Sequence, residues 1–227
     1  MIRRRMLTLA GAFVAASIIP GEKAMAGPHP NRDRLLIEAA GDGHIKEVKK
    51  LLEGDADVKA VDKDGNTALM AATHKNRIEV AKVLIDAGSD VNQQNNILDS
   101  PYLYAGAEGL TEILVLTLEN GADLKSTNRF GGTALIPAAE KGHPDNVRIL
   151  IEAGVDVNHI NNLGWTALLE AIILTDGGPV HQEIVKLLID GDADVNLADF
   201  DGVTPLQHAQ RMGYAIIAQM LIDAGAY

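Results

Sequence analysis

The sequence predicts an all-α repeat solenoid, and three observations lead to this prediction. A short segment recurs five times, with its copies 33 residues apart except for a last step of 38 residues. Each copy begins with a hydroxyl residue that can cap a helix. A second apolar segment follows, and in most repeats a glycine stands at its end. The chain of 227 residues is 47% hydrophobic but only 4% aromatic, so its core must be built from aliphatic side chains.

The recurring segment reads as the start of a first helix in each repeat. The five copies are Thr67-Ala-Leu-Met-Ala-Ala, Ser100-Pro-Tyr-Leu-Tyr-Ala, Thr133-Ala-Leu-Ile-Pro-Ala, Thr166-Ala-Leu-Leu-Glu-Ala and Thr204-Pro-Leu-Gln-His-Ala. The hydroxyl oxygen can accept a hydrogen bond from a free N–H group of the first turn. Pro101 and Pro205 stand at the first helical position, where a missing N–H group is tolerated. A degenerate sixth copy begins at Arg34.

A second helix and a fixed stop signal follow in each repeat. Apolar residues recur at helical spacing, as in Val80, Val83 and Leu84. Glycines at the expected left-handed stop come next, at Gly88, Gly121, Gly154 and Gly225. Asp-Val-Asn or a relative of it then leads into a connecting segment that usually ends in glycine. The order of signals therefore predicts one helix pair per period.

These motifs resemble the ankyrin repeat. Asp64-Gly-Asn-Thr-Ala-Leu69 and Leu84-Ile-Asp-Ala-Gly-Ser-Asp-Val-Asn92 are typical of that family, and the resemblance covers about residues 31–227. It implies helix pairs joined by β-hairpin fingers. The expected repeats lie near residues 31–61, 62–94, 95–127, 128–160, 161–198 and 199–227. A narrower similarity to small stand-alone bacterial ankyrin proteins, over residues 128–143, 163–171 and 176–178, implies a bacterial source and no particular chemistry.

Several positions depart from the repeat pattern. Leu98 replaces the finger glycine, and Asp55 and Asp192 replace the helix-stop glycine. Thr117 stands where Leu84 and its counterparts stand elsewhere, so repeat three is expected to be the weakest link, and leucine at this position is expected to stabilise it. Repeat five carries five extra residues within the segment 175–181.

Residues 1–26 read as an export signal. Three arginines are followed by an uncharged run over residues 6–19, which as a helix would extend about 21 Å, less than the roughly 30 Å of a bilayer core. Ala24-Met25-Ala26 has the pattern of a signal-peptidase site. The mature domain is then residues 27–227 in the periplasm, with secretion beyond the cell or a retained anchor as alternatives. The arginines fit both the twin-arginine and the general secretory routes.

Composition argues against several classes of function. The net charge of −11 disfavours nucleic-acid binding, because an acidic surface repels phosphate. The absence of cysteine excludes thiolate metal sites and a catalytic thiol. No metalloprotease histidine pair, serine elbow or phosphate-binding glycine loop occurs. We therefore expect a non-enzymatic, monomeric protein with no cofactor or metal and no stable membrane insertion of the mature chain.

Apolar residues at the tips of the fingers suggest a binding surface for a protein partner. Such tips normally carry polar residues because they face water. Here repeats three to six present Ile97, Arg129, Phe130, Leu163, Trp165 and Phe200 along one edge. Exposed apolar residues in a row indicate recognition, with Trp165 and Phe130 as anchors and Arg129 beside them. The alternative is that these tips pack on one another for stability alone.

A second hypothesis places a ligand site at the insertion of repeat five. Glu170, Asp176 and His181 lie close in sequence and could hold a small ligand or metal, or support weak hydrolysis. Insertions in repeat proteins often carry function, which motivates this alternative.

The export signal generates the first prediction. We expect the mature protein to begin at or near Gly27 because the small residues before it suit signal peptidase. N-terminal sequencing of the fractionated protein measures this directly, and a full-length cytoplasmic product would contradict it. Replacing Arg3 and Arg4 with lysine tests the route, since only twin-arginine export requires the arginine pair.

Overall fold

A computed structural model describes residues 30–227, and the proposed signal at residues 1–26 lies outside this part of the chain. The described residues form twelve helices and no β-sheet, with an isolated bridge between Val61 and Thr67. The helices are α1 (Pro30–Asp42), α2 (Ile45–Glu53), α3 (Ala68–His74), α4 (Ile78–Asp86), α5 (Pro101–Ala107), α6 (Thr111–Glu119), α7 (Leu135–Glu140), α8 (Pro144–Ala153), α9 (Ala167–Ile173), α10 (Pro179–Asp190), α11 (Pro205–Met212) and α12 (Ala215–Asp223). None of them has both the length and the apolar character needed to cross a bilayer.

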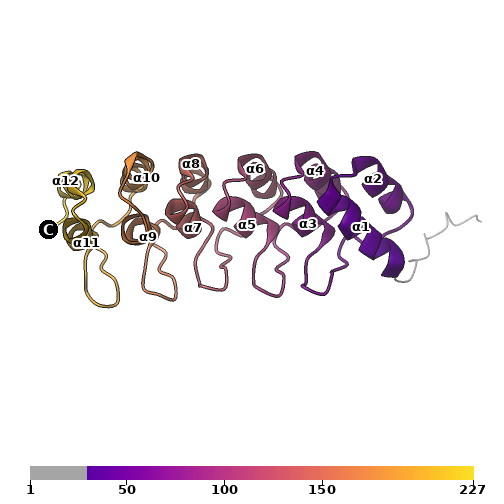
Figure 1. Ribbon diagram of the computed structural model, residues 1–227, viewed down its shortest axis with the longest axis horizontal. Coiled ribbons are helices and arrows are strands. Elements are labelled where there is room, and N and C mark those ends of the chain that lie inside the picture. The colour runs from indigo at the N-terminus through magenta and orange to yellow at the C-terminus, as the bar shows by residue number, and fades with distance from the viewer. Residues whose placement is uncertain (1–29) are drawn as a thin grey trace, which may run out of the picture.

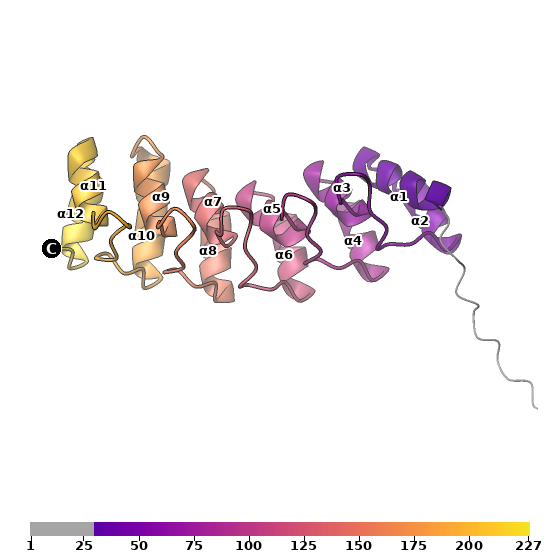
Figure 2. The same cartoon turned by 90° about the horizontal axis from the view of Figure 1, so that it is seen from below.

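The helix pairs stack side by side into one elongated solenoid, as the sequence predicts (Figures 1 and 2). From α3 onwards, the first helices of the pairs form one row, the second helices form another, and the fingers hang from the first row. The core lies between the rows and between neighbouring pairs. Leucines at the repeating second-helix position are completely buried, as at Leu84, Leu150 and Leu188. Burial of this aliphatic position in successive repeats joins them into a single core.

Four of the five predicted helix caps are confirmed, and one is wrong. The side-chain oxygens of Thr67, Ser100, Thr166 and Thr204 each accept a hydrogen bond from the N–H group three residues on. Thr133 does not cap α7, and its buried hydroxyl has no partner in the described structure. The cause is Pro137, which has no N–H group to donate to the Thr133 carbonyl. The Ile136 N–H group bonds that carbonyl instead, at 3.3 Å, and α7 begins one residue later than its counterparts.

The residues that replace glycine keep the backbone geometry that glycine would have. Asp55 and Asp192 have φ of 61° and 66°, beside 84° to 94° at the glycine stops of the other repeats. Leu98 has φ of 61° at the finger position. Left-handed geometry at a non-glycine residue costs on the order of 1–2 kcal/mol. The stack therefore enforces the left-handed stop even where the sequence does not favour it.

Each finger is held by one side chain at its first residue. An Asp or Asn oxygen there accepts hydrogen bonds from the N–H groups two and four residues on, at 2.8–3.1 Å. The five residues are Asp62, Asn95, Asn128, Asn161 and Asp199. We call this arrangement the finger lock. Successive fingers are also joined, since the Asn96 N–H group donates to the Asp64 carbonyl at 3.0 Å and that of Asn162 to the Phe130 carbonyl at 2.9 Å.

Repeat three combines two unusual core residues. Thr117 is fully buried, and its hydroxyl donates to the Leu114 carbonyl at 2.8 Å. Tyr102 is also fully buried, in the place that Leu69 fills in repeat two, and its hydroxyl has no partner in the described structure. Burial raises the pKa of the Tyr102 phenol, and the nearby Asp123 carboxylate raises it further. The phenol therefore lies near Asp123, which follows α6, and α6 is the helix that carries Thr117 in place of the larger leucine of other repeats.

This pairing changes the expectation for Thr117→Leu. We expect the single substitution to destabilise the protein by about 1–3 kcal/mol, because it adds volume to a core that Tyr102 already fills. Adding Tyr102→Leu restores the residues of the other repeats, so the double variant is expected to recover at least about 0.5–1 kcal/mol relative to additivity. Urea unfolding of the four proteins measures the coupling. Strict additivity would show that the two side chains do not share this space.

Candidate functional site

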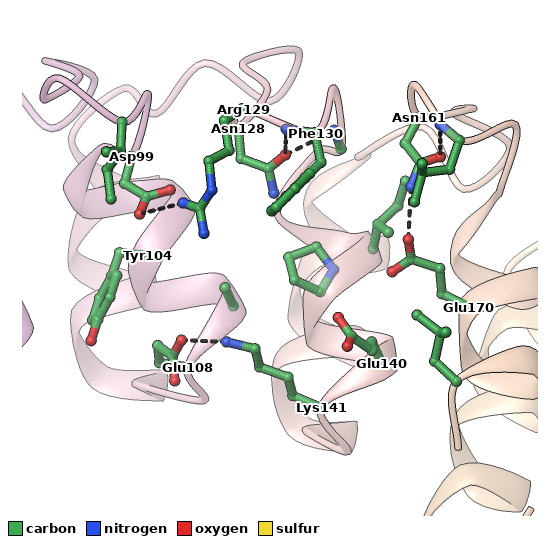
Figure 3. Close-up of a pocket in the computed structure, with 17 residues that line it drawn as sticks. Asp99, Tyr104, Glu108, Asn128, Arg129, Phe130, Glu140, Lys141, Asn161 and Glu170 are labelled. Carbon is green, nitrogen blue, oxygen red and sulfur yellow. Dashed lines mark hydrogen bonds and ion pairs between the residues drawn. The ribbon is translucent and has the colours of Figure 1, made fainter.

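A groove of about 570 Å³ crosses repeats three to five between the fingers and the first helices (Figure 3). Fingertip residues Ile97, Phe130 and Leu163 form one side of it, and residues of α5, α7 and α9 form the other. We call this cavity the finger groove. Its residues come from three successive repeats, so its shape depends on the stacking of those repeats.

The finger groove lies where repeat four carries small side chains. Gly132 follows its fingertip, at the position of Asp99 in repeat three and Trp165 in repeat five. Pro137 occupies the helix position that Tyr104 and Glu170 occupy in the same two repeats. Both Gly132 and Pro137 line the groove. Repeat four is therefore hollowed between two repeats that carry larger side chains.

The structure brings together four of the six predicted partner-binding residues. Ile97, Phe130 and Leu163 are each about half exposed, at 51%, 52% and 53%, and they line the groove together with Arg129. They occupy the same position in successive fingers, two residues after the lock residue. The locks hold the backbone of all three, so their side chains are presented in a regular row.

Phe200 and Trp165 lie outside the groove. Phe200 is 75% exposed, but it stands one residue earlier in its finger, where its ring lies over Gly164 of the preceding finger. Trp165 is partly buried at the position of Gly132. For Phe200, packing against the neighbouring finger and exposure to solvent therefore coexist.

Arg129 is fixed between an aromatic ring and a carboxylate. Its guanidinium lies 4.7 Å from the centre of the Phe130 ring and 3.7 Å from the Asp99 carboxylate. Burial raises the pKa of Asp99, and the positive charge of Arg129 offsets part of that rise. The arginine therefore neutralises a half-buried acid while it covers one face of Phe130.

Glutamates dominate the charge of the groove on the side of repeat five. Lys141 pairs with Glu108, which leaves Glu140 and Glu170 as the other carboxylates of the lining. Glu170 is only 6% exposed and accepts a hydrogen bond from the Asn161 amide at 2.7 Å. Burial, with the charge of Glu140 as a second cause, raises the pKa of Glu170 to about 7. This carboxyl therefore changes its charge near neutral pH.

The alternative ligand site is only partly assembled. Nδ1 of His181 lies 3.7 Å from the exposed Asp176 carboxylate, but its Nε2 is within hydrogen-bond distance of the Glu140 carbonyl, at 3.0 Å. The ring also packs near Gly142 of the preceding repeat. Glu170 belongs to the finger groove and bonds Asn161 instead. Across residues 30–227, no group of three histidine or acidic side chains is arranged to hold a metal ion.

Sequence reasoning missed the polar part of the groove. Asp99, Glu108, Glu140 and Lys141 lie on three different helices or fingers, and no local motif connects them. The small residues Gly132 and Pro137 were detectable, because comparison of the repeats at those positions reveals them. The finger locks were detectable in the same way, as an Asp or Asn at each period.

Comparisons with known proteins agree with the observed architecture. A family model described as ankyrin repeats (3 copies) matches residues 13–95 and 103–199. A crystal structure of an ankyrin repeat domain from Acinetobacter baumannii AYE is 58% identical, with a TM-score of 0.83 over 85% of this chain and 98% of that one. The ankyrin repeat protein EF0377 is 49% identical, with a TM-score of 0.80 over 82% and 96% of the two chains.

A curated relative gives a shorter match. The Escherichia coli (strain K12) protein YahD, named for ankyrin repeats, is 52% identical over 58 residues. That segment is 26% of this chain and 29% of YahD. The two solved structures therefore cover the repeat array far more completely than this relative does.

The buried Glu170 generates a prediction about stability and pH. Its folded pKa of about 7 exceeds the ordinary value of 4.5, so the folded state favours the protonated form. The resulting penalty is absent below about pH 4.5 and grows as the pH rises from there to about 7. We expect Glu170→Gln to stabilise the protein by about 1–3 kcal/mol at pH 8 and by much less at pH 5. Urea unfolding at the two pH values measures this, and an equal effect at both would contradict the assignment.

Proposed function

Because the chain belongs to the ankyrin repeat family, we propose that it is a binding module whose finger groove holds a segment of another protein. The observation that carries the proposal is the row of half-exposed Ile97, Phe130 and Leu163 along one side of that groove. Apolar side chains held at the solvent surface favour contact with an apolar partner. A groove that crosses three repeats also suits a chain segment longer than a single side chain.

The rigidity of the site supports binding. In each of the three fingers, two backbone N–H groups donate hydrogen bonds to the side-chain oxygen of the lock residue. A surface ordered before the partner arrives loses little conformational entropy when the partner docks. Phe130 and Arg129 form the central anchor in this proposal, and Trp165 and Phe200 extend the contact surface beyond the groove.

The proposal includes a location and a mode of action. The basic start, short apolar run and small residues of segment 1–26 favour export to the periplasm, with the module acting there as a monomer. The module acts by recognition rather than catalysis, as a scaffold or a binding subunit. Its acidic charge favours protein partners over nucleic acids.

Gly132 offers a way to block the groove without disturbing the fold. A Cβ atom added there would lie 3.5 Å from the Cβ atom of Ile136 and 3.6 Å from Oδ1 of Asn128, which are ordinary contact distances. In repeat five, Trp165 occupies the same position and the finger lock still forms, at 3.0 Å. Gly132→Trp therefore copies a residue that the repeat already tolerates.

We expect Gly132→Trp and Phe130→Ala to abolish capture of proteins from a periplasmic extract while thermal unfolding stays unchanged. Loss of an aromatic anchor commonly costs at least about 2 kcal/mol, roughly 30-fold in affinity. Trp165→Ala, outside the groove, is expected to weaken capture less. The measurement is quantitative mass spectrometry of proteins retained by each immobilised variant.

Ile216→Ala is the matched control, because Ile216 on α12 is exposed to a similar extent, 56% against 52% for Phe130. Proteins retained equally by the wild type and by Gly132→Trp would show that the groove is not the binding site. If Phe130→Ala lowers the melting temperature while the protein that remains folded still captures the same partners, the role of Phe130 is structural and not in binding.

A further inference from the structure

The charges of the finger groove are unevenly partnered. Its lining carries four carboxylates, on Asp99, Glu108, Glu140 and Glu170, and two cations, on Arg129 and Lys141. Arg129 is drawn to Asp99 and Lys141 to Glu108, both in repeat three. Figure 3 shows these two pairs towards repeat three, Glu140 beside Lys141 at the end of α7, and Glu170 towards repeat five. Within residues 30–227, no ion pair involves Glu140 or Glu170.

Glu170 sits in the groove wall at an energetic disadvantage. Its side chain is more than nine-tenths buried, and its one side-chain hydrogen bond within residues 30–227 comes from Asn161 to Oε1. Its charge also repels that of Glu140 on the neighbouring helix α7. A cation placed between the two carboxylates would offset both the cost of burying the Glu170 charge and the repulsion between the two carboxylates. Beside its apolar row, the groove therefore carries two carboxylates that have no ion pair among the described residues and that a cation from a partner would stabilise.

We propose that the protein segment held in the finger groove places a lysine or arginine side chain between Glu140 and Glu170, with an adjacent apolar side chain against Phe130 and Leu163. This inference rests on the proposed function and names the chemistry of the partner. The long apolar stem of a lysine or arginine suits the walls formed by Pro137 and Leu174, while its charged end reaches the glutamates. A bound metal is disfavoured, because the described residues offer no group of three ligands.

The same geometry makes recognition depend on pH. Helices α7, α10 and α11 pack against α9, which carries Glu170, and among their titratable groups it is Glu140 on α7 that acts on the charge of Glu170. His181 on α10 is instead within hydrogen-bond distance of the Glu140 carbonyl, and His208 on α11 of the Asp199 carboxylate, at 2.7 Å. The cation binds only the ionised glutamate, whose pKa in the free protein is about 7. Lowering the pH from 8 to 6 is therefore expected to weaken binding about tenfold.

The test is selection from a displayed library of random dodecapeptides at pH 8. Wild-type protein is compared with Glu140→Gln/Glu170→Gln and with a control that removes the same charge elsewhere. The control is Glu119→Gln/Glu152→Gln, which alters two exposed glutamates on α6 and α8 that line no part of the groove. We expect lysine and arginine to be enriched several-fold beside apolar residues on the wild type and the control, and not on the groove variant.

The outcomes separate the two proposals. Peptides that are lost on Gly132→Trp but carry no excess of lysine or arginine would overturn this inference and leave the proposed function standing. Equal enrichment on the groove variant would also overturn it, since the acidity of the whole protein would then explain the preference. A failure to select any peptide sensitive to Gly132→Trp would overturn the proposed function itself.

A second measurement tests the pH dependence of binding. The most enriched peptide is titrated against wild-type protein at about pH 6 and pH 8, with Glu170→Gln as the comparison. We expect the tenfold difference in wild type and little difference in Glu170→Gln, because glutamine does not titrate. Equal affinity at both pH values in the wild type would overturn the inference.

Discussion

The hydrogen bonds that two backbone N–H groups donate to one side-chain oxygen, repeated in each of the five fingers, underlie the rest of the site. The oxygen belongs to Asn128 in repeat four, and it holds the N–H groups of Phe130 and Gly132 at 2.9 and 3.1 Å. Without it these groups would need water, and the fingertip would have no fixed direction. The stacked helices set the spacing between repeats, and the locks turn that spacing into a row of side chains. The groove therefore depends both on the hydrogen bonds within each finger and on the apolar core that stacks the helices.

The sequence predicted the frame well because the frame depends on periodic signals. Helix caps, apolar spacing and stop glycines recur in each repeat, so one weak copy does not obscure the pattern. Where a signal was missing, neighbouring repeats decided the geometry, as the left-handed Leu98 and Asp55 show. The exception was the cap at Thr133, which failed because Pro137 four residues later lacks the N–H group that its carbonyl needs. The loss of this cap depends on two residues four positions apart in the same helical turn. A comparison of the capping positions alone does not include the second residue.

The candidate site was less predictable, for a different reason. The fingertip residues could be found because each departs from the polar residues expected in water. The interaction between Glu140 and Glu170 could not be found, because it depends on two helices thirty residues apart placing their acidic side chains near each other. Phe200 illustrates the same limit. One step of register within its finger directs its ring onto Gly164 rather than into the groove.

The finger lock also bears on how such a protein diversifies. The lock oxygen accepts only from the main chain of residues such as Ile97, Phe130 and Leu163, and these half-exposed side chains lie outside the buried core. A single substitution at a fingertip is therefore expected to disturb folding less than one in the core. A lineage carrying this array could exchange one partner for another through a few such changes, while the helices beneath stay almost constant in sequence. Variation among relatives is then expected to concentrate two residues after each lock, and its pattern would record changes of partner.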